Sequence, residues 1–291
     1  MKKNNVQMVD LMGQYSKIKN EIDRNIISSI ESGRFVNGPI VKEFSENLSG
    51  YLNVENVIPC ANGTDALQIA LMGLGLKKGD EIITADFTFA ATVEVISLLG
   101  LTPVLVDIDI ETYNIDVSAV KKAITDKTKA IVVVHTYGLV CDVEKIKEYC
   151  VDKEIKIIED TAEAHGQHVN DIKCGTFGDI STLSFYANKH ITTGEGGLLL
   201  TDSDTFHEKA KEMRNLGFNN TKRFQHENFY WNYRLSGIQA ALGISQINSL
   251  EKTIKQKQTQ GEYYQTLLSD ISDRVQLPLS KWKNTYNHYW V

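Results

Sequence analysis

The sequence contains little proline and cysteine, and it has no long uninterrupted apolar run. Only four prolines and four cysteines occur among its 291 residues. The longest apolar stretch, residues 89–106, is interrupted by Glu94 and Pro103, so it is not typical of a membrane span. Residues 1–5 carry charge, but no apolar segment follows them, and we therefore expect no signal peptide.

The cysteines are scattered along the chain and form no C-x-x-C pair. This pattern favours reduced, mostly buried thiols in a cytoplasmic protein. The four residues are Cys60, Cys141, Cys150 and Cys174.

Basic charge is also scarce. The net charge of −6 and the pI near 5.7 give no electrostatic reason to expect binding to nucleic acid. The pair Lys121 and Lys122 lies in a helical pattern and is expected to face solvent. With 42% apolar and 23% charged residues, the composition is that of an ordinary globular protein. The length allows one large domain or two unequal ones.

Between residues 55 and 200, short β-branched runs alternate with longer amphipathic segments. Parallel strands joined by helices produce this alternation, because both faces of their sheet are covered. The predicted strands are residues 57–59, 81–84, 103–107, 130–134, 155–159, 180–185 and 197–201, with helices at 64–76, 90–100, 117–125 and 142–153. We therefore predict an α/β fold with a mainly parallel sheet between helices, and chemistry at the carboxyl ends of the strands.

Beyond residue 204 the pattern is mostly helical. Helices are predicted at 204–216 and at 234–270, the second with an interruption. The apolar residues 288–291 are predicted to begin a strand. No low-complexity linker or internal repeat divides the chain.

The first candidate site is N-G-T-D at residues 62–65, between a predicted strand and helix. Gly63 permits close approach to the backbone, and Thr64 brings a hydroxyl to the start of the helix. Together with free amides and the helix dipole, these residues suit a phosphate. The alternative is a plain helix cap by Asn62 or Thr64. The stretch lacks the G-K-[ST] of a P-loop, which disfavours a nucleoside triphosphate.

The second candidate site is E-D-T-A-E-A-H-G at residues 159–166. An apolar strand ends there in two carboxylates, which places Asp160 at the carboxyl end of the strand. A carboxylate at that position can pair with a protonated ring nitrogen and keep a pyridinium cationic. The alternatives are a helix cap by Asp160 and a solvated Glu163. His165 and His168 raise the question of a metal, but no further ligand stands at metalloenzyme spacing, so we expect none.

The third candidate site is the segment 184–197, which contains Lys189 and the G-E-G-G turn at 194–197. We expect Lys189 to lie near a sheet end among Phe185, Tyr186 and Ile191. Burial there would disfavour the ammonium, and imine formation requires a neutral amine. The alternative is a surface lysine in a glycine-rich hairpin. Each site is ambiguous alone, but a phosphate cradle, a ring-nitrogen acid and an imine lysine follow one another along a single α/β pattern.

These motifs resemble the DegT/DnrJ/EryC1/StrS sugar aminotransferases, and the resemblance covers nearly the whole chain. The matching stretches are N-G-T-D-A-L at 62–67, G-D-E-I-I-T at 79–84, T-F-A-A-T at 88–92, P-V-L-V-D at 103–107, E-D-T-A-E-A-H-G at 159–166, T-T-G-E-G-G at 192–197, W-N-Y-R-L at 231–235 and Q-A-A-L-G at 239–243. The resemblance implies a pyridoxal 5′-phosphate (PLP)-dependent transferase of fold type I, similar to aspartate aminotransferase.

The resemblance also implies a role for each matching residue. Lys189 corresponds to the lysine that forms the Schiff base and carries the proton, and Asp160 to the partner of the pyridinium nitrogen. The implied cofactor contacts are Gly63, Thr64 and Ser184 at the phosphate, Phe89 stacked on the ring, Glu163 on the side of the phenolic oxygen, and Asn232 inserted from a neighbouring subunit. A homodimer with a shared active site follows. Apart from the resemblance, His190 is expected to be a packing residue rather than a catalyst, since a histidine near a site is often structural.

Family members continue through a small C-terminal domain, which implies a large PLP-binding domain with an N-terminal arm at 1–250 and an incomplete small domain at 251–291. Residues 163–166 and 185–189 most resemble a branch that aminates C4 of a GDP-linked 4-keto-6-deoxymannose with L-glutamate, in the synthesis of cell-surface glycans such as O-antigen. Residues 65–68 resemble branches acting on UDP- or dTDP-sugars equally well. A PLP-dependent sugar 3-dehydratase and a non-catalytic regulatory relative are the alternatives. A related dehydratase branch replaces the lysine by histidine, so Lys189 favours transamination.

Overall fold

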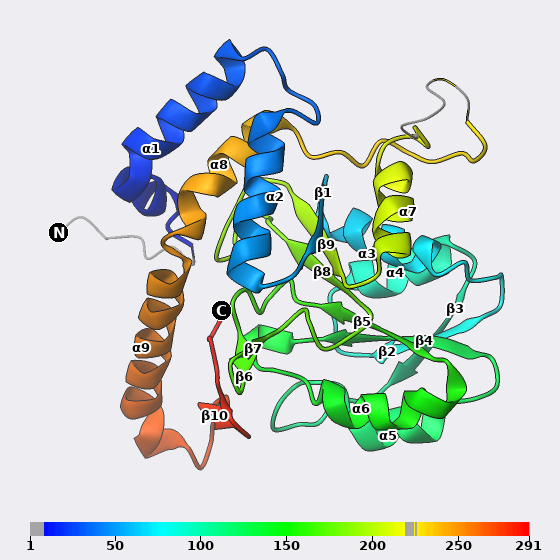
Figure 1. Cartoon of the computed structure of the whole chain (residues 1–291). Coiled ribbons are helices and arrows are strands. Elements are labelled where there is room, and N and C mark those ends of the chain that lie inside the picture. Colours follow the sequence, from blue (N-terminus) through cyan, green and yellow to red (C-terminus); the bar gives the residue numbers. More distant parts are fainter. Residues whose placement is uncertain (1–8, 219–223, 225, 291) are drawn as a thin grey trace.

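The computed structural model describes residues 9–218, 224 and 226–290, and residues 1–5, where a signal peptide was considered, lie outside it. Its centre is a seven-stranded sheet in the order β1-β9-β8-β5-β4-β2-β3 (Figure 1). The strands are β1 (Asn56–Cys60), β2 (Glu81–Ala85), β3 (Thr102–Val106), β4 (Thr128–Val134), β5 (Lys156–Asp160), β8 (Ile180–Ser184) and β9 (Gly197–Thr201). All seven coincide with predicted strands to within two residues.

The sheet is mainly parallel, as predicted. The pairs β2–β3, β2–β4, β4–β5 and β5–β8 are parallel, whereas β9 is antiparallel to both of its neighbours, β8 and β1. Six strands therefore run in one direction and β9 alone opposes them. A chain reversal between β8 and β9 is possible because only a loop, residues 185–196, connects them. That loop contains Lys189.

Helices cover both faces of the sheet, and the sequence of the strands explains why. Ile82 and Val132 face one apolar cluster, whereas their neighbours Ile83 and Val133 face another. Strands that are buried on both sides read as continuous apolar runs. The first face is covered by α3 (Gly63–Gly73), α4 (Ala90–Leu98) and α7 (Asp204–Arg214), and the second by α5 (Val117–Ala123) and α6 (Val143–Cys150).

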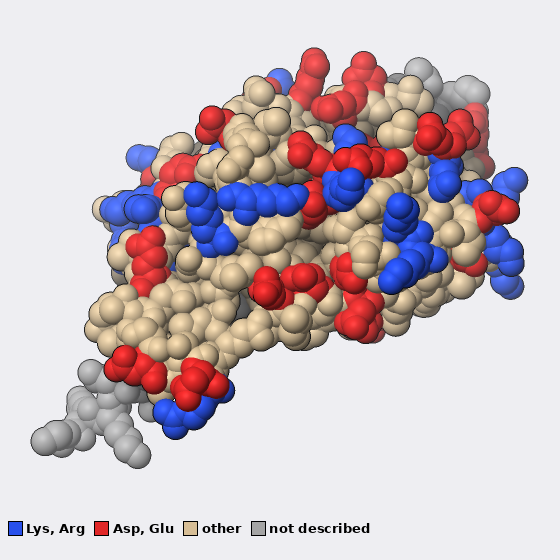
Figure 2. Space-filling model, turned by 90° about the horizontal axis from the view of Figure 1, so that it is seen from below, with Lys and Arg blue, Asp and Glu red and all other residues tan. Residues whose placement is uncertain are grey.

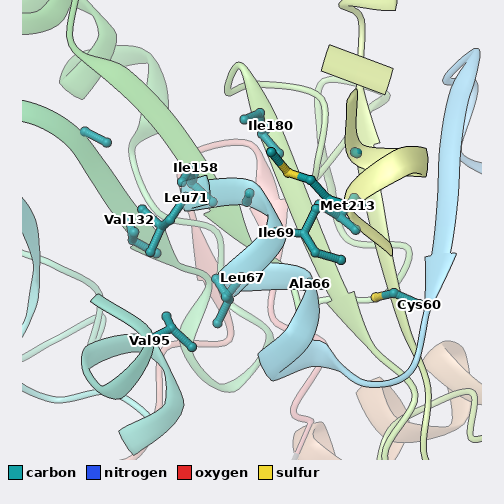
Figure 3. Close-up of a cluster of buried hydrophobic side chains, with 14 of the residues drawn as sticks. Cys60, Ala66, Leu67, Ile69, Leu71, Val95, Val132, Ile158, Ile180 and Met213 are labelled. Atoms are coloured by element: carbon teal, nitrogen blue, oxygen red, sulfur yellow. The ribbon is translucent and has the colours of Figure 1, made fainter. Parts of the chain in front are cut away.

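Figure 3 shows how α3 lies on the sheet. Leu67 and Leu71 of this helix point toward Val95 of α4 and toward Val132 and Ile158 of the central strands. Full burial of one such side chain stabilises the folded state by about 1.5–3 kcal/mol. This packing fixes the start of α3 relative to the ends of β1 and β5.

The N-terminal and C-terminal helices, which the sequence did not predict in full, cover the second face of the sheet at its other end, where Leu183 of β8 and Leu198 and Leu200 of β9 pack against them. Helix α1 (Leu11–Glu31) and α2 (Pro39–Leu52) pack against α8 (Gly237–Ile247), and α9 (Leu250–Leu268) extends from it (Figure 1). The predicted interruption in 234–270 is confirmed at Asn248 and Ser249. Residues 234–236 are not helical, because Ser236 caps α8 in a capping box with Gln239.

The remaining elements of the described residues are two short hairpins and three 3₁₀ turns. They are the hairpins β6 (His168–Val169) with β7 (Ile172–Lys173) and β10 (Lys281–Trp282) with β11 (Thr285–Tyr286), and the 3₁₀ turns η1 (Thr136–Gly138), η2 (Val151–Lys153) and η3 (Ser269–Ile271). Beyond β11 the chain returns to the large sheet, where residues 287–290 form no strand of it. The division into domains at residue 250 stays a prediction.

The cysteines are buried and the Lys121–Lys122 pair faces solvent, as the sequence predicted. All four cysteines are free thiols. Acidic and basic side chains lie interspersed on the face that Figure 2 shows. None of the helices within the described ranges is long and apolar enough to cross a membrane.

Candidate active site

The predicted site residues lie at the carboxyl ends of three strands. Asp160 ends β5, Ser184 ends β8, and β1 leads directly to Gly63 at the start of α3. Parallel strands bring such ends to one edge of the sheet. The fold thus collects residues that stand more than a hundred positions apart.

Gly63 and Ser184 form one wall of a cradle. A Cβ atom placed on Gly63 would lie 2.7 Å from the Cβ of Ser184, so this contact requires glycine. Asn62 is the helix cap, because its side chain accepts from the N–H of Asp65 at 2.8 Å. Within the described part of the chain, the N–H groups of Gly63 and Thr64 donate to no other residue. Thr64 is exposed beside them. The capping alternative is therefore correct for Asn62. It leaves the two amides of Gly63 and Thr64 free at a helix N-terminus, which is a site suited to an anion.

Asp160 lies 7% exposed at the end of β5. Its carboxylate accepts from the N–H of Ala162 at 3.1 Å and from the hydroxyl of Thr92, on the first turn of α4, at 3.5 Å. Burial raises the pKa of this carboxyl, and the nearby Lys189 lowers it in part. A buried carboxylate with so few donors retains capacity for a cationic partner.

Lys189 is buried in the loop between β8 and β9, where 11% of its side chain is exposed. Desolvation lowers its pKa, while the carboxylates of Glu163 and Asp160 act in the opposite direction. The surface-lysine alternative is therefore wrong. Of the three expected neighbours, Phe185 and Ile191 are buried, but Tyr186 is about half exposed because it turns out of the loop.

Glu163 connects Lys189 to the end of β4. One of its carboxylate oxygens lies 4.0 Å from the Lys189 Nζ, and the other accepts from the backbone N–H of Tyr137 at 2.8 Å. Burial raises the pKa of this carboxyl. The solvated-face alternative for Glu163 is wrong, since its side chain is 17% exposed.

Phe89 and Asn232 are both exposed in the single chain. Phe89 precedes α4, so the same turn that brings Thr92 to Asp160 presents its ring, which is 75% exposed. The Asn232 side chain accepts from the guanidinium of Arg234 at 2.9 Å. The adjacent Tyr233 accepts through its carbonyl from Ala61 at 2.8 Å, which places this segment beside the cradle. Among the described residues no contact joins Asn232 to Lys189 or Gly63.

Glu159, the other carboxylate at the end of β5, serves the fold. It is fully buried and accepts from the backbone N–H groups of Gly175, Phe177 and Gly178 at 2.6–3.0 Å. It also accepts from the His135 Nε2 at 2.9 Å. Because the His135 Nδ1 accepts from the N–H of Cys141, Nε2 carries the proton. All of its oxygen capacity is therefore used within the protein.

Three histidines lie buried behind Lys189. The ring of His190 is 6.0 Å from that of His165 and 6.3 Å from that of His288. Burial lowers the pKa of His165 to about 3 and that of His288 to about 4, and it lowers the pKa of His190 well below its usual range. His168 is exposed on β6, and it acts with burial to lower the pKa of His288. Within the described ranges, no group of three or more metal-binding side chains is arranged to hold an ion.

These histidines predict an acid-sensitive fold. They stay neutral when folded but titrate near 6.5 when unfolded, so their stabilising effect is complete above that pH and is lost as the pH falls. We expect the free energy of unfolding to fall by about 1 kcal/mol per histidine between pH 6 and pH 5. The raised pKa values of Asp160 and Glu163 offset this loss in part, since protonation of these carboxyls favours the folded state.

Urea unfolding at a series of pH values measures the slope. His190→Leu should reduce it by about one third, since one of three titrating groups is removed. The exposed His226→Asn is the matched control and should leave the slope unchanged. A free energy of unfolding that stays level from pH 7 to pH 5 would contradict the prediction.

Two residues near Lys189 were missed by sequence reasoning. The backbone of Tyr137 bonds to Glu163, and Trp290 lies over Lys189, with the ring centroid 3.8 Å from Nζ. Tyr137 has a positive φ of 55°. This conformation is unusual for a bulky residue, and such residues are enriched at functional sites. Trp290 offers no local signal, because its proximity depends on the path of the chain after α9.

The residues present fit PLP. The cradle at Gly63 and Ser184 would hold its phosphate, Asp160 would face its ring nitrogen, and Lys189 is a buried amine of lowered pKa for its aldehyde. Phe89 would offer its exposed ring for stacking. The observation that decides the fit is the joint placement of two free amides, a buried carboxylate and a buried lysine at one sheet edge.

Comparison with known proteins identifies the family of the chain. A family model described as the DegT/DnrJ/EryC1/StrS aminotransferase family matches residues 16–291. GDP-perosamine synthase of Vibrio cholerae is 37% identical over 254 residues, which cover 87% of this chain and 68% of that protein. The UDP-2-acetamido-2-deoxy-3-oxo-D-glucuronate aminotransferase of Pseudomonas aeruginosa is 34% identical over 267 residues, 91% of this chain and 74% of that protein.

Among solved structures, DesV of S. venezuelae in complex with a ketimine intermediate superposes with a TM-score of 0.91 at 29% identity, over 98% of this chain and 76% of that one. The fold is that of PLP-dependent enzymes of fold type I. The chain belongs to the DegT/DnrJ/EryC1/StrS aminotransferase family. It is an aminotransferase, and its cofactor is PLP.

Proposed function

We propose that this aminotransferase transfers an amino group to the keto carbon of a nucleotide-linked sugar. The single observation that carries the proposal is the meeting of Lys189, Asp160 and the Gly63–Ser184 cradle at one sheet edge in a chain of this family. The relatives named above support the nucleotide sugar, because one is named for a GDP-linked product and the other for a UDP-linked substrate.

We further propose that the substrate is a GDP-linked 4-keto-6-deoxymannose, aminated at C4 with L-glutamate as donor. Support comes from GDP-perosamine synthases of three organisms, which are 36–37% identical to the chain. A UDP- or dTDP-linked keto sugar, aminated at C3 or C4, is the alternative that relatives at 33–35% identity favour.

In the proposed mechanism, PLP supplies the electron sink that stabilises the carbanion at the reacting carbon. Asp160 keeps the ring nitrogen protonated, since its buried carboxylate has a raised affinity for a proton or a cation. Lys189 moves a proton between the two carbons of the transfer, and its lowered pKa increases the neutral fraction of the amine at a given pH. The carboxylate of Glu163 lies 4.0 Å from Nζ and stabilises the positive charge of this lysine when the amine is protonated.

The active site is proposed to be completed in a homodimer. Asn232 is exposed beside the cradle, on a segment whose neighbours Trp231 and Phe229 are 73% and 99% exposed. Exposed aromatic side chains of this size favour an interface. In this proposal Asn232 of one subunit reaches the phosphate bound by the other.

A substrate panel tests the function. We expect the PLP-loaded protein to convert glutamate to 2-oxoglutarate in the presence of a GDP-linked 4-keto-6-deoxy sugar, with the new amine at C4 by NMR. A clear preference for a UDP- or dTDP-linked keto sugar would overturn the GDP assignment. Loss of water from the sugar without glutamate consumption would identify a dehydratase. No turnover with any keto sugar, in a protein that binds PLP, would support a regulatory relative.

A further inference from the structure

The segment after β11 reaches the active site and covers Lys189. The centroid of the Trp290 ring lies 3.8 Å from the Lys189 Nζ, which is well within the distance for a cation–π interaction. Lys189 is itself buried, so little water competes for its charge. This contact joins the far end of the described chain to the residue that carries the proposed chemistry.

Backbone contacts hold Trp290 in this position. Its N–H donates to the carbonyl of Tyr137 at 3.1 Å, and the N–H of His288 donates to the carbonyl of Gly138 at 3.2 Å. Gly138 has a φ of +88°, and a Cβ atom there would lie 3.1 Å from the Cβ of His288 and 3.4 Å from the N of Trp290. The segment can therefore approach the turn after β4 because residue 138 is a glycine.

A side-chain amide fastens the same segment. Gln167 donates through Nε2 to the carbonyls of Gly138 and Tyr286, and its Oε1 accepts from the hydroxyl of Thr285 at 3.1 Å. Thr285 and Tyr286 lie just before the segment, and Gly138 lies on the turn that the segment contacts. Trp290 is thus positioned by a network rather than by the indole contact alone.

The indole and a carboxylate flank the same nitrogen. Glu163 lies 4.0 Å from Nζ, and the turn that bonds to this carboxylate through the Tyr137 N–H bonds to Trp290 through the Tyr137 carbonyl. Both flanking groups favour the ammonium, whereas burial favours the neutral amine. The amine of Lys189 must be neutral to attack an aldehyde and must accept a proton during transfer. A group that shifts this balance therefore acts on the reaction through Lys189.

We propose that Trp290 is a positioning residue of the active site, which holds the ammonium form of Lys189 against its indole face whenever this amine is not bonded to the cofactor. The inference rests on the proposed role of Lys189 and deepens it. Without the indole, the buried amine is more often neutral and reacts more readily at a given pH.

Rapid mixing of the cofactor-free full chain with saturating PLP tests this proposal. The rate at which the visible absorbance band of the lysine-linked cofactor appears reports the neutral fraction of Lys189, and the rate rises with pH. Trp290→Leu keeps an apolar side chain but removes the π face, so its pH profile should move to lower pH. On the rising part of the profile we expect a rate about 2- to 10-fold higher than in the wild type. Trp290→Phe should lie between them.

Trp282→Leu is the matched control. On the β10–β11 hairpin the Lys283 Nζ lies 4.6 Å from the centroid of the Trp282 ring. This variant therefore loses a cation–π pair of the same kind away from the active site. Its profile should coincide with that of the wild type. A Trp290→Leu profile that coincides with the wild type overturns the proposal. If wild-type protein treated with PLP and borohydride gains no mass on Lys189, the proposed function fails instead, and the two failures are thus distinguishable.

Tryptophan fluorescence decides the placement if the leucine variant does not fold. The chain has three tryptophans, and the indole nearest to the bound cofactor should be quenched most strongly by it. Trp290→Phe should remove most of the quenching that PLP causes in the wild type, whereas Trp282→Phe should leave it unchanged. Undiminished quenching in Trp290→Phe would overturn the assignment.

Discussion

Lys189→Ala should lower the rate of amino transfer by roughly 10²–10⁴-fold or more and prevent covalent retention of the cofactor. The variant removes the only buried amine that the described residues place beside Asp160 and Glu163. The measurement is the turnover of glutamate with a keto-sugar nucleotide, together with the visible spectrum of the PLP-loaded protein. An unchanged spectrum and rate would contradict the assignment of Lys189.

Two controls separate chemistry from folding. Lys189→Arg keeps a cation in the site but cannot form the linkage, so it should be as inactive as the alanine variant. Lys147→Ala removes an exposed lysine of α6, which donates to the carbonyl of Phe177, and it should retain activity. Equal melting temperatures would show that the fold is retained.

The lysine variant also tests the shared site. Subunits with Lys189→Ala mixed with subunits with Asn232→Ala should regain about a quarter of wild-type activity, since half of the dimers are mixed and each has one complete site. No recovery after verified subunit exchange would place Asn232 and Lys189 of each site in one subunit, whereas full activity of Asn232→Ala alone would place Asn232 outside the site.

Asp160→Asn should lower the rate by about 10²–10³-fold, which is the usual effect of removing an electrostatic partner from a buried site. Asparagine has nearly the same shape and can still accept from Ala162, but it has no negative charge to keep a ring nitrogen protonated. The loss should appear in kcat, with a displaced absorbance maximum of the bound cofactor. Full activity in a folded variant would exclude the pairing.

Asp107→Asn is the matched control for this change. Asp107 follows β3, the edge strand farthest from β1, and it is exposed. The same loss of one negative charge should leave the rate and the spectrum unchanged there. If both variants lose activity equally, a general effect of charge on the protein would replace the specific role of Asp160.

The roles of the neighbouring carboxylates Glu159 and Asp160 could be predicted from the sequence only in part. Both end the same apolar run, and their order along the chain predicts opposite faces of the strand. Only the structure shows that Glu159 is enclosed by backbone N–H groups and His135, whereas Asp160 is left with spare acceptor capacity. The prediction of Asp160 as the functional one rested on its place at the carboxyl end of the strand and on the family resemblance, and its role stays a proposal.

The buried state of Lys189 was likewise predicted, but its surroundings were only partly so. Phe185 and Ile191 lie in the core as expected, and Tyr186 does not. Helices α1 and α2 were not predicted, although the buried residues of α2 stand at helical spacing. Both helices pack on α8, which is distant in sequence. Strand positions were accurate because burial on both faces leaves a continuous apolar run in the sequence.

The sequence by itself determined the α/β alternation and, through the family resemblance, the class of cofactor, because strand runs, helix starts and the matching motifs are local patterns. The role of Lys189 stays a proposal. The tertiary structure alone decided which groups surround that lysine. Trp290 and Glu163 meet it from two elements joined through the backbone of Tyr137. Such contacts depend on where the chain returns after α9, and no local spacing encodes that path.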